Sequence, residues 1–173
     1  MGGQRLIENH SSTLSLQQFM KKHGLKNETM TESDLRRIYD YKIYPRDSKI
    51  TTDRGFVNID NGEQGGTHWT CFIVKDNKSF YFDSFGGSPD KFLLEQLPKP
   101  ITYHNFKIQD IDSKLCGSYC LYFFYLMERM NYFDAVLTIY FTSQKIKDFL
   151  YFIFFLFTTL NANKCFRKHF FIK

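Results

Sequence analysis

Two short runs of β-branched and aromatic residues, separated by a polar turn, constrain the fold of this chain more than any other feature. The first run covers residues 67–74 and the second covers 80–82, with Asp-Asn-Lys-Ser at 76–79 between them. Runs of this composition on either side of a short polar turn are typical of an antiparallel β-hairpin. Because a hairpin brings its outer ends together, we expect His68 and Asp83 to be neighbours in the folded chain.

A cysteine at the start of an apolar stretch is the next informative feature. A polar loop leads to Cys116 and Gly117, and the pattern of a buried helix runs from there to about Met130. The first turn of a helix carries partial positive charge and unpaired N–H groups, which favour a thiolate over a thiol. We interpret Gly117 as leaving room for a substrate carbonyl beside the sulfur. Cys116 is therefore the candidate nucleophile; the alternative is a small buried apolar residue, as most free cysteines are.

Three further residues have the side chains that a nucleophilic cysteine requires. His68 is the candidate general base, and Asp83 would fix the tautomer of its imidazole. Gln109 follows a strand expected at 101–108 and would donate an amide N–H to a developing oxyanion. The structural alternatives are a strand histidine, a turn aspartate and a surface glutamine. Together with Cys116, these three residues predict a cysteine hydrolase with a Cys-His-Asp triad.

Other chemistries have weaker signals. Cys116 and Cys120 with a histidine form a weak zinc pattern that lacks a second pair of ligands at the usual spacing, so we expect no bound metal and no cofactor. The sequence contains no Walker loop, no Rossmann fingerprint and no Gly-x-Ser-x-Gly elbow. We expect Trp69 to lie in the core and His104 to be structural.

The chain divides into three segments by composition. Residues 1–30 are a polar N-terminal segment, 31–141 are the expected catalytic domain, and 142–173 are a Phe-rich C-terminal tail of uncertain structure. The most apolar part of the tail, 149–160, is shorter than the roughly 20 residues that span a bilayer. We therefore expect no interaction with a membrane.

Weaker local signals complete the expected secondary structure. A short helix is expected at 14–23, and a second helix with apolar residues at helical spacing begins with a cap at Thr31. Residues 44–66 are rich in glycine and indicate loops with short extended pieces. A helix at 90–97, capped by Ser88, precedes the strand at 101–108. Strands and helices in this mixture predict an α+β domain.

Composition supports a folded domain with reduced thiols. The chain has 43% apolar and 24% charged residues, a net charge of +5, and four cysteines. Its first twenty residues lack the apolar core of a secretory signal, so we expect an intracellular protein without a disulfide framework. The basic residues are scattered in pairs, which is typical of a solvated surface; a surface that binds nucleic acid is the alternative.

Four motifs, in this order, resemble those of a known family. They are G-T-H-W at 66–69, Y-F-D-S-F-G at 81–86, Gln109, and L-C-G-S-Y-C at 115–120. The chain resembles the adenovirus-type cysteine proteases (adenain), especially the adenain-like proteases of Polinton/Maverick DNA transposons. The wider group includes the SUMO proteases, but the spacing of seven from Gln109 to the cysteine resembles the adenain version.

The resemblance implies a fold, a reaction and a set of partners. It implies a papain-like α+β core in which a small mixed sheet packs on the helix that carries the nucleophile. It assigns His68 as base, Asp83 as orienting carboxylate (where adenain has Glu), Gln109 as oxyanion donor and Cys116 as nucleophile. The expected substrates are viral or transposon structural proteins cleaved near Gly-Gly, by a monomer located in the nucleus or in virus-like particles. DNA or a peptide is a possible activator by analogy with the family.

Two other functions remain open at this point. One is an isopeptidase that acts on ubiquitin or a ubiquitin-like modifier, which uses the same catalytic residues. The other is a catalytically degenerate module that binds a peptide or DNA. The intact set of four candidate catalytic residues favours an enzyme over the degenerate module.

Overall fold

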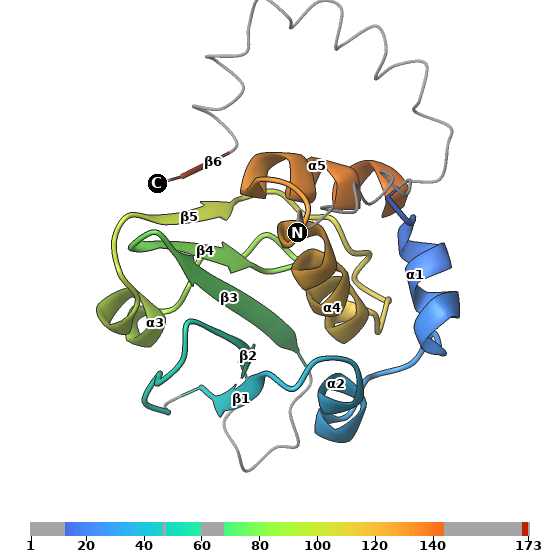
Figure 1. Cartoon of the computed structure of the whole chain (residues 1–173), viewed down its shortest axis with the longest axis horizontal. Helices are drawn as coiled ribbons and strands as arrows, with labels where there is room; N and C mark the ends of the chain where they lie inside the picture. Colours follow the sequence, from blue (N-terminus) through green and yellow to red (C-terminus); the bar gives the residue numbers. More distant parts are fainter. Residues whose placement is uncertain (1–12, 47, 60–67, 144–170, 173) are drawn as a thin grey trace, which may run out of the picture.

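The computed structural model describes residues 13–46, 48–59, 68–143 and 171–172 (Figure 1). Within these residues the chain forms helices and a mixed sheet, as the sequence predicts. The elements are α1 (Leu16–His23), α2 (Glu32–Ile38), β1 (Lys42–Pro45), β2 (Arg54–Asn58), β3 (Trp69–Lys75), β4 (Lys78–Phe82), α3 (Lys91–Gln96), β5 (Ile101–His104), α4 (Cys116–Met127), α5 (Tyr132–Ser143) and β6 (Phe171–Ile172).

The strands form one sheet in the order of the sequence, from β1 to β6. Strands β1 and β2 are parallel, as are β4 and β5, whereas the other neighbouring pairs are antiparallel. The central pair, β3 and β4, is the hairpin that the sequence predicts, with Cys71 opposite Phe82 and Lys75 opposite Lys78. The sheet is therefore mixed, with the hairpin at its centre.

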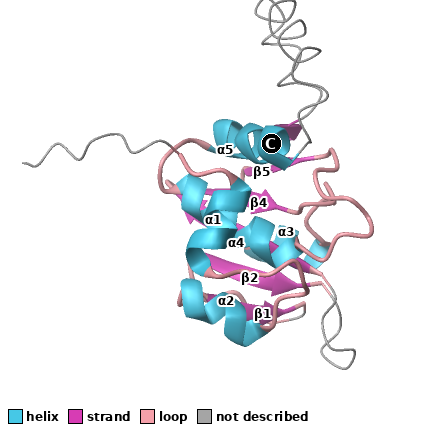
Figure 2. Cartoon of the chain, turned by 90° about the vertical axis from the view of Figure 1, so that its right-hand side faces the viewer, coloured by secondary structure: helices cyan, strands magenta, loops and turns pink. Residues whose placement is uncertain are grey.

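Helix α4 packs against one face of the sheet and lies at the centre of the larger core (Figure 2). Its residues from Cys116 to Leu126 are all buried, which is why the sequence of this helix is apolar around its whole circumference. Helices α1, α2 and α5 surround it. Trp69, Cys71 and Ile73 of β3 belong to the same core.

A smaller core lies on the opposite face of the sheet, beneath α3. Phe72 of β3 and Tyr81 of β4 pack there with Leu93 and Leu97. Alternate residues of β3 therefore enter different cores, which is the period expected of a strand that is covered on both faces. The hairpin is thus covered by helices on both faces, and this packing holds its outer ends in place.

Several element boundaries differ from the expectation. Helix α3 begins after Asp90, whose side chain accepts a hydrogen bond from the Leu93 N–H at 2.9 Å, so Asp90 and not Ser88 is the cap. The extended structure at 101–108 ends at His104, because the chain then turns toward β4: the Ile108 N–H bonds to the Ser84 carbonyl. Helix α4 ends at Met127 instead of Met130.

The N-terminal helix expected at 14–23 is present as α1. Most of the Phe-rich tail, including 149–160, lies outside the described residues. Among the helices that the structure does describe, none has the length and apolar character needed to cross a membrane.

Candidate active site

The hairpin brings His68 and Asp83 together. Strand β3 begins at Trp69 and β4 ends at Phe82, so the two residues lie just beyond the paired ends of the strands. The Nε2 atom of His68 is 2.8 Å from Oδ1 of Asp83. Both side chains are largely buried, with 15% and 6% of their surface exposed. This confirms the proximity that the sequence predicts.

The turn after β4 holds the Asp83 carboxylate in place. The Phe85 N–H donates to Oδ1 of Asp83 at 2.8 Å, and the Gly86 N–H donates to its backbone carbonyl at 2.8 Å. A Cβ atom at Gly87 would lie only 2.5 Å from Oδ2 of Asp83, so this position has no room for a side chain. The Phe85 ring covers the imidazole of His68, with 4.6 Å between ring centroids. These contacts fix both the carboxylate and the imidazole.

Cys116 is the first residue of α4 and is almost completely buried. Its sulfur lies 3.5 Å from the backbone N of Trp69, the residue next to His68. Leu115, which precedes the helix, has an apolar side chain and makes no capping hydrogen bond to the N–H groups of the first turn. The first residue of β3 therefore supplies a hydrogen-bond donor to the cysteine, and the residue just before the strand supplies the imidazole.

The side chains of His68 and Cys116 shift each other's pKa in opposite directions. Burial alone would lower the pKa of His68, but hydrogen bonding and charge interactions with Asp83 and Cys116 raise it to about 9. Burial alone would raise the pKa of Cys116, but His68 and the Trp69 N–H lower it below the ordinary value. Each group therefore favours the charged form of the other, which is the electrostatic arrangement of a thiolate–imidazolium pair.

The ring nitrogen of His68 that faces away from Asp83 is available for the cysteine. Its Nδ1 atom is buried and makes no conventional hydrogen bond within the described structure. Nε2 is already engaged with Asp83, so Nδ1 is the ring nitrogen left for an interaction with the Cys116 sulfur. The contact with the carboxylate thereby fixes the orientation of the imidazole ring.

Gln109 lies in the loop between β5 and α4, where it is buried and hydrogen-bonded at both ends of its amide. Its Oε1 atom is 2.7 Å from the hydroxyl of Ser84, and its Nε2 atom donates to the Ser113 carbonyl at 2.6 Å. The loop therefore ties this glutamine both to the turn next to Asp83 and to the segment that leads into Cys116. Gln109 is therefore not a surface glutamine, which was the structural alternative considered from the sequence.

Met30, in the loop before α2, packs against Trp69 and the first turn of α4. Its carbonyl accepts a hydrogen bond from the Trp69 indole N–H at 2.9 Å, and the Ser118 hydroxyl lies 3.5 Å from its sulfur. A Cβ atom at Gly117 would lie 3.0 Å from the Met30 Cβ. The structure thus gives Gly117 a packing role that the sequence did not predict, because the absence of a side chain makes room for Met30.

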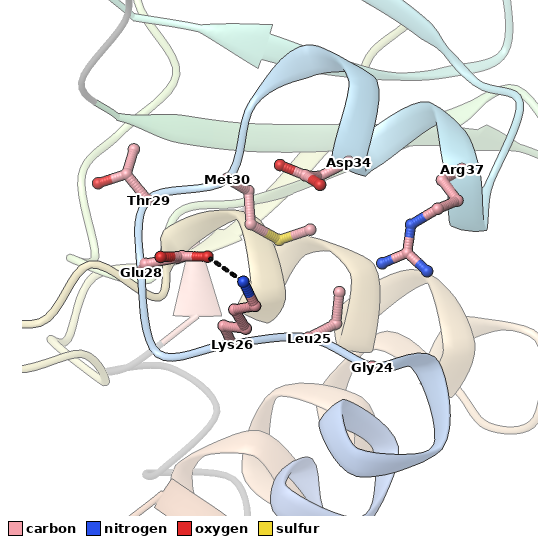
Figure 3. Close-up of a pocket in the computed structure, with 8 residues that line it drawn as sticks. All are labelled: Gly24, Leu25, Lys26, Glu28, Thr29, Met30, Asp34 and Arg37. Atoms are coloured by element: carbon pink, nitrogen blue, oxygen red, sulfur yellow. Dashed lines mark ion pairs between the residues drawn. The ribbon is translucent and has the colours of Figure 1, made fainter.

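A polar pocket lies on the far side of Met30, between α1 and α2 (Figure 3). The Met30 side chain points into it, and an ion pair between Lys26 and Glu28, 3.6 Å apart, spans its rim. Asp34 and Arg37 of α2 complete the charged lining. The pocket therefore borders the residue that packs on Gly117, although its own lining contains none of the four candidate catalytic residues.

The other cysteines and histidines of the described chain have structural surroundings. Cys120 is fully buried and donates toward the Trp69 carbonyl at 3.4 Å, and Trp69 itself lies in the core as expected. His104 is buried against Phe82, with its Nδ1 atom 3.3 Å from the Tyr132 hydroxyl. No group of three or more potential metal ligands is found among the residues that the structure describes.

The sequence indicates the four candidate catalytic residues but not four of the groups that surround them. Ser84 and Phe85 belong to the motif at 81–86, but the sequence predicts no contact for either of them. Nothing in the sequence indicates that Met30 lies beside the site. The Trp69 N–H was also missed, because backbone donors are invisible in a sequence. In comparisons with known proteins, no protein-family model matches the chain, and no curated protein matches it either.

Proposed function

We propose that this protein is a cysteine peptidase in which Cys116 is the nucleophile, His68 the acid and base, and Asp83 the orienting carboxylate. The observation that carries the proposal is the reciprocal pKa shift of Cys116 and His68 beside the 2.8 Å contact between His68 and Asp83. A buried structural cysteine has no reason to have its pKa lowered, because burial acts in the opposite direction. The lowered pKa of Cys116, together with the contact between His68 and Asp83, supports a nucleophilic cysteine.

The reaction uses the two charged groups in turn. The Cys116 thiolate attacks the scissile carbonyl carbon, and the carbonyl oxygen becomes an oxyanion. The C–N bond then breaks as the His68 imidazolium gives its proton to the leaving amine, which leaves a thioester on Cys116. Water attacks the thioester with neutral His68 as base; the acid product leaves, and the thiolate and imidazolium are restored.

Gln109 stabilises the oxyanion in both steps. Its Nε2 carries two hydrogen atoms, and only one is needed for the bond to the Ser113 carbonyl. The second is free to donate to the oxyanion, together with the backbone N–H groups at the start of α4. Loss of one such donor typically lowers the catalytic rate by about 100-fold or more.

The resemblance to adenain-like proteases supplies the finer proposal. The fold is then a papain-like core of the adenain type, in which the sheet packs on the helix that carries Cys116. The substrates are viral or transposon structural proteins cleaved near Gly-Gly, and DNA or a short peptide is the candidate activator. An isopeptide bond would be cleaved by the same four residues, so the substrate panel must distinguish the two reactions.

The decisive experiment compares the wild type with two cysteine variants. Each protein is incubated with a fluorogenic peptide ending in Gly-Gly, with and without DNA, and with a thiol-directed peptide electrophile. We expect labelling and cleavage by the wild type and neither by Cys116→Ala. Cys120→Ala is the matched control, because it removes a buried thiol from the same helix while leaving the nucleophile.

Three results would change the proposal. Labelling of Cys116→Ala at the wild-type rate would show that Cys116 is not the reactive cysteine. An unreactive Cys116 in the folded wild type, together with salt-sensitive retention of DNA and no cleavage, would favour the degenerate binding module. Cleavage of a modifier–lysine isopeptide, but not of the linear peptide, would favour the isopeptidase.

A further inference from the structure

Ser84, the residue after Asp83, places a buried hydroxyl group beside Gln109. Ser84 is fully buried, and its hydroxyl lies 2.7 Å from Oε1 of Gln109. Its carbonyl accepts hydrogen bonds from two successive backbone N–H groups, those of Ile108 and Gln109, each at 2.9 Å. Ser84 therefore holds Gln109 by both its backbone and its side chain, from the turn that also holds the Asp83 carboxylate.

The chemistry of the partners fixes which way the Gln109 amide points. The Ser113 carbonyl can only accept a hydrogen bond, so the amide group 2.6 Å away must be the NH₂. Oε1 then faces Ser84, and the Ser84 hydroxyl must be the donor in that pair. A flipped amide would place two acceptors against each other at Ser113. The Ser113 contact thus selects one orientation out of two, and the Ser84 hydroxyl provides the donor that Oε1 needs in that orientation.

We propose that Ser84 is a positioning residue: its hydroxyl holds Oε1 of Gln109 in place and so keeps the second N–H of the amide directed at the oxyanion. This inference rests on the proposed function, because it concerns the oxyanion donor of that same reaction. Without the Ser84 hydroxyl, Oε1 is a buried acceptor with no partner, which is costly enough for the side chain to rotate or to admit water. Either change displaces a donor that must be in place before the reaction begins.

Two reactions of Cys116 separate positioning of the oxyanion donor from formation of the thiolate. Peptide hydrolysis needs the thiolate and the oxyanion donor. Alkylation by iodoacetamide needs the thiolate alone, because displacement of iodide creates no oxyanion. For Ser84→Ala we expect kcat for the peptide to fall by about 10-fold or more, with KM nearly unchanged, since misplaced donors act on the transition state. The alkylation rate and its pH profile should remain those of the wild type.

A double-mutant cycle tests whether Ser84 acts through Gln109. We expect Gln109→Ala to lower kcat by about 100-fold or more, and the double variant Ser84→Ala/Gln109→Ala to be no slower than Gln109→Ala alone. Ser79→Ala is the matched control. It removes another fully buried serine hydroxyl, one that bonds to the Pro98 carbonyl at 2.6 Å from the far end of β4. Its stability should fall without a selective loss of hydrolysis.

The outcomes distinguish this inference from the proposed function. If the wild type neither hydrolyses peptides nor shows accelerated alkylation at Cys116, the proposed function fails. If the wild type is active and Ser84→Ala hydrolyses the peptide at the same rate, or if the two substitutions act additively, the positioning role of Ser84 is wrong. Ser84→Thr keeps the hydroxyl and should keep more activity than Ser84→Ala; a selective loss of hydrolysis in Ser84→Thr equal to that of Ser84→Ala would also overturn the inference.

Discussion

At the scale of single residues, the charge on Cys116 and the charge on His68 depend on each other. Both side chains lie in surroundings that disfavour an isolated charge, since burial is the first influence on the pKa of each. Each group favours the charged form of the other, while Asp83 holds the opposite ring nitrogen of His68. Removal of either partner is therefore expected to return the other toward its neutral form.

The pH dependence of hydrolysis should show both members of this pair. The pKa of Cys116 is lowered, so the thiolate is present above it; the pKa of His68 is raised to about 9, so the imidazolium is present below about pH 9. We expect kcat/KM to rise with thiolate formation and to fall above about pH 9. Alkylation by iodoacetamide requires no imidazolium and should not fall there.

This pair of pH profiles has a direct control in His68→Gln, which removes the cationic partner. In that variant the pH at which alkylation begins should move upward, because the thiolate has lost the group that stabilises it. A wild-type alkylation profile in His68→Gln would show that the imidazole does not lower the pKa of Cys116.

The residues of the site differ in how visible they are in the sequence. The proximity of His68 and Asp83 could be predicted because a short hairpin joins them. The contact from Ser84 to Gln109 spans 25 positions and that from Met30 to Ser118 spans 88. Such contacts depend on how the turn after β4 and the loop between α1 and α2 pack against the rest of the chain. No local sequence pattern predicts that packing.

At the scale of elements, the hairpin β3–β4 has His68 and Asp83 at its open end and is closed at the other end by a two-residue turn. Asp76 and Asn77 both adopt positive φ, 52° and 56°, and Lys75 pairs with Lys78 across the turn. Positive φ at both central residues is the requirement of a type I′ turn, which matches the twist of the flanking strands. Asp and Asn tolerate this conformation better than other residues with a side chain.

A substitution at the turn should change stability without changing catalysis. We expect Asn77→Ala to lower the free energy of unfolding by about 1 kcal/mol, because alanine resists positive φ, and Asn77→Gly to be at least as stable as the Ala variant. Urea unfolding measures the effect. Activity per folded molecule should stay at the wild-type value, since the outer ends of the strands are held by both cores.

Asn27→Ala is the matched control for the turn, because Asn27 is exposed and is not among the described residues with positive φ. Equal losses of stability in Asn27→Ala and Asn77→Ala would contradict the assignment of the loss to turn geometry. A loss of activity per folded molecule in Asn77→Ala would show that the turn, and not only the strand ends, positions the site.

The elements that could be predicted are those whose signal is local. The hairpin, α1 and α4 follow from turn residues and apolar patterns within one segment. Strands β1 and β2 were expected only as short extended pieces, because their pairing depends on partners elsewhere in the sheet. The parallel pairing of β4 with β5 also has no local signal, since it joins strands separated by α3.

At the scale of the whole molecule, α5 is held to the sheet through buried polar groups. The Tyr132 hydroxyl donates to the Tyr81 carbonyl of β4 at 2.8 Å and lies 3.3 Å from Nδ1 of His104 on β5. His104 is almost completely buried between the rings of Phe82 and Phe106. The junction of α5 with the sheet therefore contains a histidine in surroundings that disfavour its charged form.

Protonation of His104 should make the whole domain less stable in mild acid. Burial lowers the pKa of His104 to about 4, although the nearby Asp83 acts in the opposite direction. Between pH 6.5 and pH 4 the unfolded chain therefore binds a proton that the folded chain does not, so folding weakens as the pH falls through this range. One pKa unit corresponds to about 1.4 kcal/mol, so His104 should remove about 2 kcal/mol of unfolding free energy between pH 7 and pH 5.

The test compares the pH dependence of stability, which separates titration from a general loss of packing. Urea unfolding of the wild type, His104→Gln and His23→Gln is measured at pH 7 and pH 5. His104→Gln lowers stability at both pH values but should lose about 2 kcal/mol less than the wild type on acidification, because glutamine does not titrate. His23 is only partly buried, so His23→Gln should keep most of the wild-type dependence. An unchanged dependence in His104→Gln would mean that His104 is not the group whose protonation opposes folding.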